Sequence, residues 1–142
     1  MNVEIIIFMM NESNMRRIIK KDYIMIGSDA GALTHKPPLG VGKPHPRNFG
    51  TFPQVLGSLV VKEKLMSMPE AIRKMTSLPC SRLGINDRGK IAPKMKADLV
   101  LFDPKKIQDK STYENPMVYP EGINMVLVNG VAVVEDGEYT GA

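Results

Sequence analysis

The stretch Tyr23-Ile24-Met25-Ile26-Gly27-Ser28-Asp29 decides the fold that the sequence predicts. Its first four residues form a short apolar run, and a longer, isoleucine-rich run precedes it at residues 3–10. Continuous apolar runs are typical of strands that are covered on both faces in a parallel sheet. Residues 11–21 have helical spacing, with apolar side chains on one side and basic ones on the other. We therefore predict an α/β fold that begins with a strand–helix–strand unit and a right-handed crossover.

The rest of the chain predicts helices first and strands afterwards. A long polar loop rich in glycine and proline covers residues 30–51, and loops of this length are usually functional or disordered. A helix is expected from about Pro53, and a capping box at residues 67–70 predicts another through about Leu78. Residues 97–102 predict a strand, and Asn129-Gly130 predicts the turn of a β-hairpin over residues 123–134.

Composition narrows the classes of function. The net charge of +4 is spread over the chain and the longest basic runs are doublets, which argues against a nucleic-acid-binding surface. The apolar N-terminus, residues 1–10, has neither a basic region nor a cleavage site, so we expect neither a signal peptide nor a membrane span. The lone Cys80 excludes an internal disulfide and favours a reducing, cytoplasmic location.

Two loop residues are the first candidates for chemistry. Asp29 follows the end of the second predicted parallel strand, where α/β folds place catalytic groups. Arg47 lies in a proline-bounded loop, where a guanidinium is suited to gripping a carboxylate. The structural alternatives are a turn-capping aspartate and a solvent-paired arginine. His45 and His35 could each bind metal or shuttle protons, or serve only the structure of the loop.

A complete metal or nucleophile site is missing from the sequence. Catalytic zinc takes about three protein ligands, yet the chain has no His-x-His, no paired Cys and no His-Glu-x-x-His. No glycine-rich phosphate loop follows a strand, and neither Ser28 nor Ser81 has a recognisable histidine partner. These residues alone do not make a self-contained hydrolase.

Several segments together resemble one family. They are 26–29 (Ile-Gly-Ser-Asp), 42–57 (Gly-Lys-Pro-His-Pro-Arg-Asn-Phe-Gly-Thr-Phe-Pro-Gln-Val-Leu-Gly), 70–79 (Glu-Ala-Ile-Arg-Lys-Met-Thr-Ser-Leu-Pro), 87–93, 97–100 and 126–130. The chain is similar over nearly its whole length to N-acyl-D-amino-acid deacylases, the D-aminoacylases of the amidohydrolase superfamily. The His-Pro-Arg and Gly-Thr-Phe-Pro pieces are the specific ones, whereas Ala-Asp-Leu-Val and Val-Asn-Gly are widespread among amidohydrolases.

The resemblance implies a fold and a site. It implies that residues 1–88 are the final two βα units and active-site loop of a (β/α)₈, TIM-type barrel, and that residues 89–142 are the C-terminal portion of a small β-sandwich. Asp29 matches the catalytic aspartate, which sits at the zinc site with at most a weak or indirect metal contact and exchanges a proton with the metal-bound water and the departing amine. Arg47 matches the arginine that grips the substrate carboxylate, and His45 is placed with it in substrate binding.

The implied reaction is hydrolysis of an N-acyl-D-amino acid, a linear amide, to a carboxylate and a free D-amino acid. Since the other zinc ligands would lie outside this chain, we expect a C-terminal fragment that binds no zinc stably and is inactive alone. Its expected partners are the small-molecule substrate and either an N-terminal barrel portion or a second copy. The alternatives are a non-catalytic remnant or oligomerising subunit, and a fragment of a dihydroorotase-like or hydantoinase-like amidohydrolase.

Overall fold

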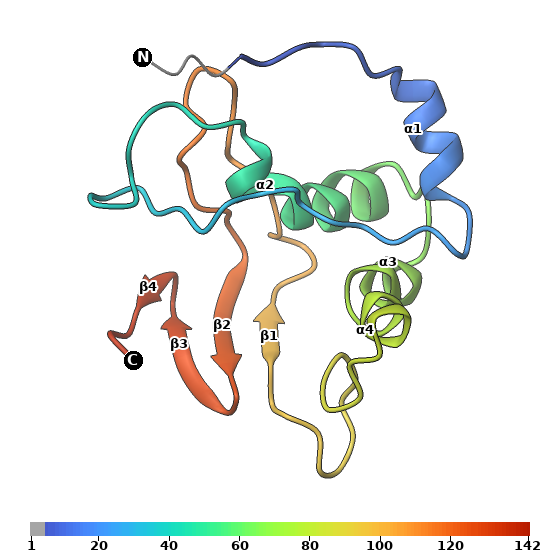
Figure 1. Ribbon diagram of the computed structural model, residues 1–142, viewed down its shortest axis with the longest axis vertical. Coiled ribbons are helices and arrows are strands. Elements are labelled where there is room, and N and C mark those ends of the chain that lie inside the picture. The colour runs from blue at the N-terminus through green and yellow to red at the C-terminus, as the bar shows by residue number, and fades with distance from the viewer. Residues whose placement is uncertain (1–4) are drawn as a thin grey trace.

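The computed structural model describes residues 5–142 as a set of helices followed by one antiparallel sheet (Figure 1). The elements are α1 (Glu12–Ile19), α2 (Arg47–Gln54), the π-helical η1 (Val55–Lys62), α3 (Met68–Met75), α4 (Ser77–Leu83), β1 (Leu99–Phe102), β2 (Ile123–Val128), β3 (Val131–Glu135) and β4 (Glu138–Tyr139). None of the helices in this part of the chain is long and apolar enough to cross a membrane.

Local capping signals form the helix ends that the sequence predicts. The Asn11 side chain accepts the Asn14 N–H at 3.0 Å and begins α1. The Ser67 hydroxyl accepts the Glu70 N–H at 3.3 Å and begins α3, as the capping box predicts. The helix expected through Leu78 is divided at Thr76, after which α4 continues to Gly84 in the left-handed conformation (φ 70°). The helix expected from about Pro53 begins earlier, at Arg47.

The sheet has the order β1-β2-β3-β4 and every neighbouring pair is antiparallel. The hairpin between β2 and β3 is confirmed, because Asn129 and Gly130 both have positive φ (50° and 86°), as a type I′ turn requires. The Asp136-Gly137 turn has the same signature and leads into β4. This sheet lies beside the helices rather than between them (Figure 1).

The two parallel strands predicted at residues 3–10 and 23–26 are wrong for the part of the chain that the structure describes. Residues 5–10 form neither helix nor strand, and residues 24–28 have no strand partner either; residues 3 and 4 lie outside the described range. The Ile26 N–H donates to the carbonyl of Lys74 in α3 (3.1 Å). A strand needs a neighbouring strand to satisfy its backbone groups, and residues 5–142 place none beside these two runs.

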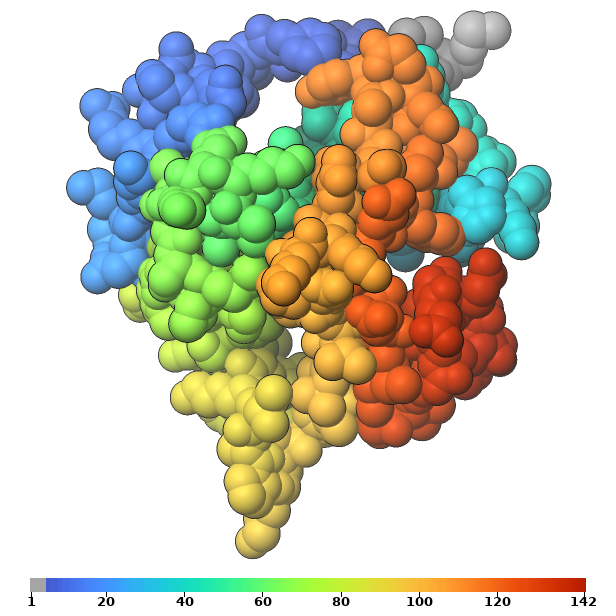
Figure 2. Space-filling model, turned by 180° about the vertical axis from the view of Figure 1, so that it is seen from behind, coloured from blue at the N-terminus to red at the C-terminus, as the bar shows by residue number. Residues whose placement is uncertain are grey.

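The core lies where η1 packs against α3 and the segment between β1 and β2. Its buried apolar residues are Val55, Leu56, Leu59, Val60, Ala71 and Ile107. Gly57 permits this packing, because a Cβ at that position would overlap the backbone carbonyl oxygen of Ile107. In the space-filling view an opening separates the blue N-terminal segment from the green helices (Figure 2). The groove between α1 and the α2–η1 helix measures about 380 Å³.

Candidate functional site

The structure brings Asp29 and Arg47 together, although they are eighteen positions apart. One Asp29 carboxylate oxygen (Oδ2) lies 2.8 Å from Nη2 of Arg47. Asp29 has a left-handed backbone (φ 49°), and its side chain is 85% exposed. The expected position at the end of a parallel strand is not seen, since the preceding residues form no strand within the described chain. The pair is therefore placed by the loop and by the start of α2, where Arg47 is the first residue.

Asn48 fastens the two sides of this loop to each other. Its Oδ1 accepts the Gly31 N–H at 2.9 Å, and its Nδ2 donates to the carbonyl oxygen of His45 at 2.8 Å. Gly31 is two residues after Asp29, and His45 is two residues before Arg47, so one side chain holds both members of the ion pair. The sequence analysis did not single out Asn48. Its one signal was an amide side chain directly after the His-Pro-Arg motif.

His45 links the start of α2 to Tyr113 in the loop before β2. Its Nδ1 accepts the backbone N–H of Arg47 at 3.0 Å, and its Nε2 lies 3.2 Å from the hydroxyl of Tyr113. Burial, and then the nearby positive charge of Arg47, lower the pKa of His45 below 6.5, which favours the neutral ring. His35 lies apart from this group, with its ring edge-on to Tyr119 at 4.9 Å between centroids.

A cavity of about 160 Å³ lies beside Arg47, between the start of α2 and the loop that precedes β2. It is lined by His45, Pro46, Arg47, Gly50, Gln54, Asp109, Ser111, Thr112 and Tyr113. The Ser111 hydroxyl reaches the Pro46 carbonyl oxygen at 3.1 Å, so the two walls are joined directly. No local sequence pattern at residues 109–113 predicts their approach to Arg47.

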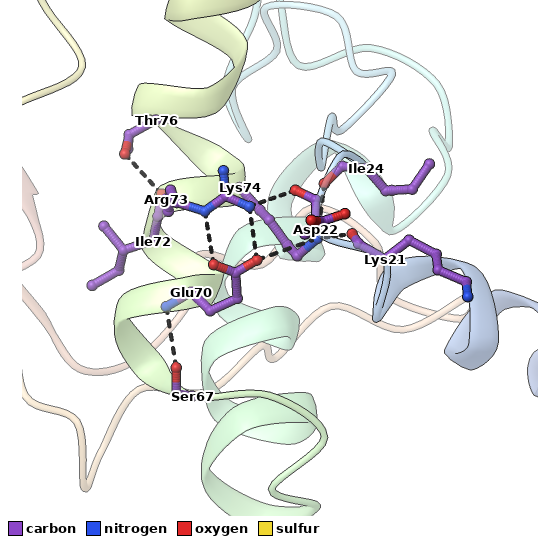
Figure 3. A network of polar contacts seen from close by, with 9 residues as sticks. All are labelled: Lys21, Asp22, Ile24, Ser67, Glu70, Ile72, Arg73, Lys74 and Thr76. Carbon is purple, nitrogen blue, oxygen red and sulfur yellow. Dashed lines mark hydrogen bonds and ion pairs between the residues drawn. The ribbon is translucent and has the colours of Figure 1, made fainter.

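A polar network on α3 holds the segment that leads to Asp29 (Figure 3). Lys74, which is 0% exposed, donates from Nζ to the carbonyl oxygens of Lys21 and Ile24, the latter at 3.1 Å. Arg73 donates to the carbonyl oxygen of Asp22 and forms a two-pronged ion pair with Glu70 at 2.7 and 2.9 Å. Hydrogen bonding to Arg73 lowers the pKa of Glu70 to about 2, so this carboxylate stays charged. The path of residues 21–26 is therefore fixed by α3.

The donor groups do not fit a complete metal centre. Within residues 5–142, no three His, Cys, Asp or Glu side chains converge as a metal ion would require. A catalytic zinc takes about three protein ligands together with water, and Asp29, His45 and Asp109, which lie near Arg47, do not form such a group. What the arrangement offers chemically is an exposed carboxylate, a guanidinium at the start of α2, and a cavity beside that guanidinium.

Comparisons with known proteins agree in pointing to one family. A model of the amidohydrolase family matches residues 13–134. N-acyl-D-aspartate deacylase of Alcaligenes xylosoxydans xylosoxydans is 40% identical over 137 residues, which are 96% of this chain and 26% of that protein. D-aminoacylase of the same organism is 40% identical over 136 residues, 96% of this chain and 27% of the relative.

Solved structures give the same result. A crystal structure of D-aminoacylase matches with a TM-score of 0.85 and 41% identity, over 95% of this chain and 27% of that one. The N-acyl-D-glutamate deacylase of Bordetella bronchiseptica, complexed with zinc and a phosphonate inhibitor, matches with a TM-score of 0.78 and 36% identity, over 92% of this chain and 27% of that one. The chain spans about a quarter of the length of these relatives.

Proposed function

Because the chain belongs to the amidohydrolase family, we propose that it supplies Asp29 and Arg47 to an active site that hydrolyses N-acyl-D-amino acids. The products are a carboxylate and a free D-amino acid. The observation that carries the proposal is the 2.8 Å ion pair between these two side chains, which join in space the two residues matched to catalysis and carboxylate binding. The similarity to deacylases of D-aspartate, D-glutamate and other D-amino acids supports this substrate class over dihydroorotase-like or hydantoinase-like ones.

The ion pair itself suggests how the two residues divide the work. Arg47 is held at the start of α2 by the loop contacts of its neighbours His45 and Asn48. A substrate carboxylate can pair with this guanidinium as the Asp29 carboxylate does, and charge-assisted hydrogen bonds from arginine to a carboxylate are strong. When the substrate takes the place of Asp29 on Arg47, the Asp29 carboxylate is released beside the bound amide. There it accepts a proton from the water that attacks the amide carbonyl and then gives that proton to the departing amine as the C–N bond breaks.

The remaining parts of the active site must come from further polypeptide. The residues present do not make a zinc site, so no step is derived through the metal, and we expect this chain alone to bind no zinc stably and to release no amino acid. In the assembled enzyme, where further polypeptide supplies neighbouring strands for residues 5–10 and 23–26, we propose residues 1–88 as the final two βα units of a barrel and residues 89–142 as part of a β-sandwich. Exposed apolar side chains such as Ile7 (62%) and Phe8 (77%) would be covered there. We place the enzyme in the cytoplasm.

The experiment pairs this chain with the complementary N-terminal portion of a D-aminoacylase and follows release of the D-amino acid from an N-acetyl-D-amino acid with zinc present. We expect activity only in the pair. Asp29→Asn should lower kcat by about 10²–10⁴-fold, because it removes the acid–base group. Arg47→Met should chiefly raise KM, whereas Arg17→Met on α1 serves as the matched control. Full activity of the Asp29→Asn pair, or release by this chain alone, contradicts the proposal.

A second candidate is an oligomerising subunit without catalysis. It is favoured by the run of exposed apolar side chains at residues 5–10, each between 42% and 82% exposed. Such a run is an unusual feature of a monomer's surface. Light scattering separates the two: a concentration-dependent dimer that forms no active pair supports the second candidate, and a stable monomer at micromolar concentration contradicts it.

A further inference from the structure

Tyr113 brings a hydroxyl from the sheet-containing half of the chain to the edge of the proposed site. This hydroxyl lies 3.2 Å from His45 Nε2, and the two rings meet edge-to-face with centroids 5.2 Å apart. Phe8 packs against the tyrosine ring at 4.9 Å. Tyr113 also lines the cavity of about 160 Å³ that Arg47 lines. The position of this ring is therefore set on two sides, by His45 and Phe8.

The direction of the hydrogen bond between Tyr113 and His45 follows from the backbone. His45 Nδ1 accepts the N–H of Arg47 at 3.0 Å, so Nδ1 carries no proton. A neutral imidazole has one N–H, which must then be on Nε2. His45 therefore donates to the Tyr113 oxygen, and the tyrosine proton is left for another acceptor. Within residues 5–142 the Tyr113 hydroxyl makes no hydrogen bond other than the one to His45.

We propose that Tyr113 is a second hydrogen-bond donor to the substrate carboxylate, acting beside Arg47 in this cavity, with His45 fixing the direction in which its proton points. The inference rests on the proposed function and adds a substrate-binding residue to it. The neighbouring carboxylate of Asp109 makes no hydrogen bond to Tyr113 within the described residues, and its Oδ1 accepts the Ser111 N–H at 2.8 Å instead. One guanidinium and one phenol together match the two oxygens of a carboxylate.

The test uses nuclear magnetic resonance on the full chain titrated with N-acetyl-D-alanine. We expect the ring nitrogens of His45 to report the Nε2–H tautomer, and the signals of Arg47 and Tyr113 to move on titration. Tyr113→Phe keeps the ring but loses the hydroxyl, so the ligand should bind about tenfold more weakly, as for the loss of one hydrogen bond to a charged group. Tyr119→Phe, beside His35, is the matched control and should bind like the parent chain.

The outcomes separate this inference from the proposed function. If Arg47→Met abolishes binding while Tyr113→Phe binds like the parent, the inference is wrong and the proposed role of Arg47 stands. If neither change matters, the carboxylate role of Arg47 fails as well. An Nδ1–H tautomer of His45, or no binding by the parent chain at millimolar ligand, also overturns the inference. In the last case the paired enzyme still tests the deacylase function separately.

Discussion

Two apolar runs of similar composition differ in their solvent exposure in this molecule. Residues 5–10 form no regular structure and are exposed, with Phe8 77% accessible, whereas Val55, Leu56, Leu59 and Val60 of the run at 55–61 are only 5–8% accessible. The second run lies in a helix, which satisfies its own backbone hydrogen bonds and buries one face against α3. The first run is the kind of segment that needs a neighbouring strand, and residues 5–142 supply none. An apolar run thus predicts that a segment tends to be buried, but it does not show whether the residues that would bury it belong to the same chain.

The contrast extends to whole regions. Residues 5–49 contain no buried residue, although they carry Asp29 and Arg47, while all of the buried apolar core lies between residues 55 and 107. The residues proposed for chemistry therefore lie outside the apolar core, and polar contacts hold their loop in place. This arrangement agrees with a site that is completed by other polypeptide.

The largest expected effect tests the contrast between the two runs directly. Leu59→Ala removes a side chain that is 7% exposed from the core, and should lower the free energy of unfolding by about 3 kcal/mol. Ile7→Ala removes a side chain that is 62% exposed, and should change it by less than about 0.5 kcal/mol. Urea unfolding followed by circular dichroism measures both. Equal losses for the two variants would show that residues 5–10 are buried in solution.

The next effect concerns the hydrogen bonds by which Lys74 on α3 holds residues 21–26. Lys74→Met removes a fully buried ammonium, so that the Ile24 carbonyl oxygen loses its donor, whereas the Lys21 carbonyl oxygen keeps the N–H of Ile24 at 3.2 Å. We expect a loss of about 2 kcal/mol, because an unsatisfied buried acceptor keeps its desolvation penalty. Hydrogen exchange should also quicken at Ile26, whose N–H bonds to the Lys74 carbonyl. Lys62→Met, at an exposed position on η1, is the control, and an effect as small as the control's would contradict the role of Lys74.

The parts of the fold that depend on neighbouring residues were predictable. The capping box at Ser67 and the Asn129-Gly130 turn each act within four residues, and both appear as predicted. The strands predicted at residues 3–10 and 23–26 do not form in the part of the chain that begins at residue 5, because strand formation depends on a partner strand elsewhere. The early start of the helix at Arg47 was also missed, since Pro46 caps it without any side-chain hydrogen bond that the sequence could signal.

The site divides in the same way. Asp29 and Arg47 were found from their loop context and from family resemblance, and the structure joins them. Ser111 and Tyr113 were not found, because their approach to residues 45–47 depends on where the connection between β1 and β2 runs. That path is set by the packing of Ile107 against η1, which no local pattern near Tyr113 encodes.

The smallest expected effect concerns the Glu70–Arg73 ion pair on α3 and its contribution to the free energy of unfolding at low pH. Hydrogen bonding to Arg73 lowers the pKa of Glu70 from 4.5 to about 2. Since the folded state holds this carboxylate charged more strongly than the unfolded state does, its contribution is fully present above pH 4.5 and is lost as the pH falls toward about 2. Glu70→Gln should therefore flatten the fall of the unfolding free energy across this window, whereas Glu114→Gln, at an exposed position in the loop before β2, should leave it as in the parent.

Urea unfolding at several pH values between 5 and 2.5 makes the measurement, and the slope against pH is the quantity to compare. Because Glu70 lies at the surface, salt screens part of its attraction to Arg73, and the difference between parent and Glu70→Gln should shrink at high ionic strength. An unchanged slope in Glu70→Gln would mean that the Glu70–Arg73 pair does not persist in solution. Arg73 would then hold Asp22 alone, and Lys74 would carry the attachment of residues 21–26 to α3.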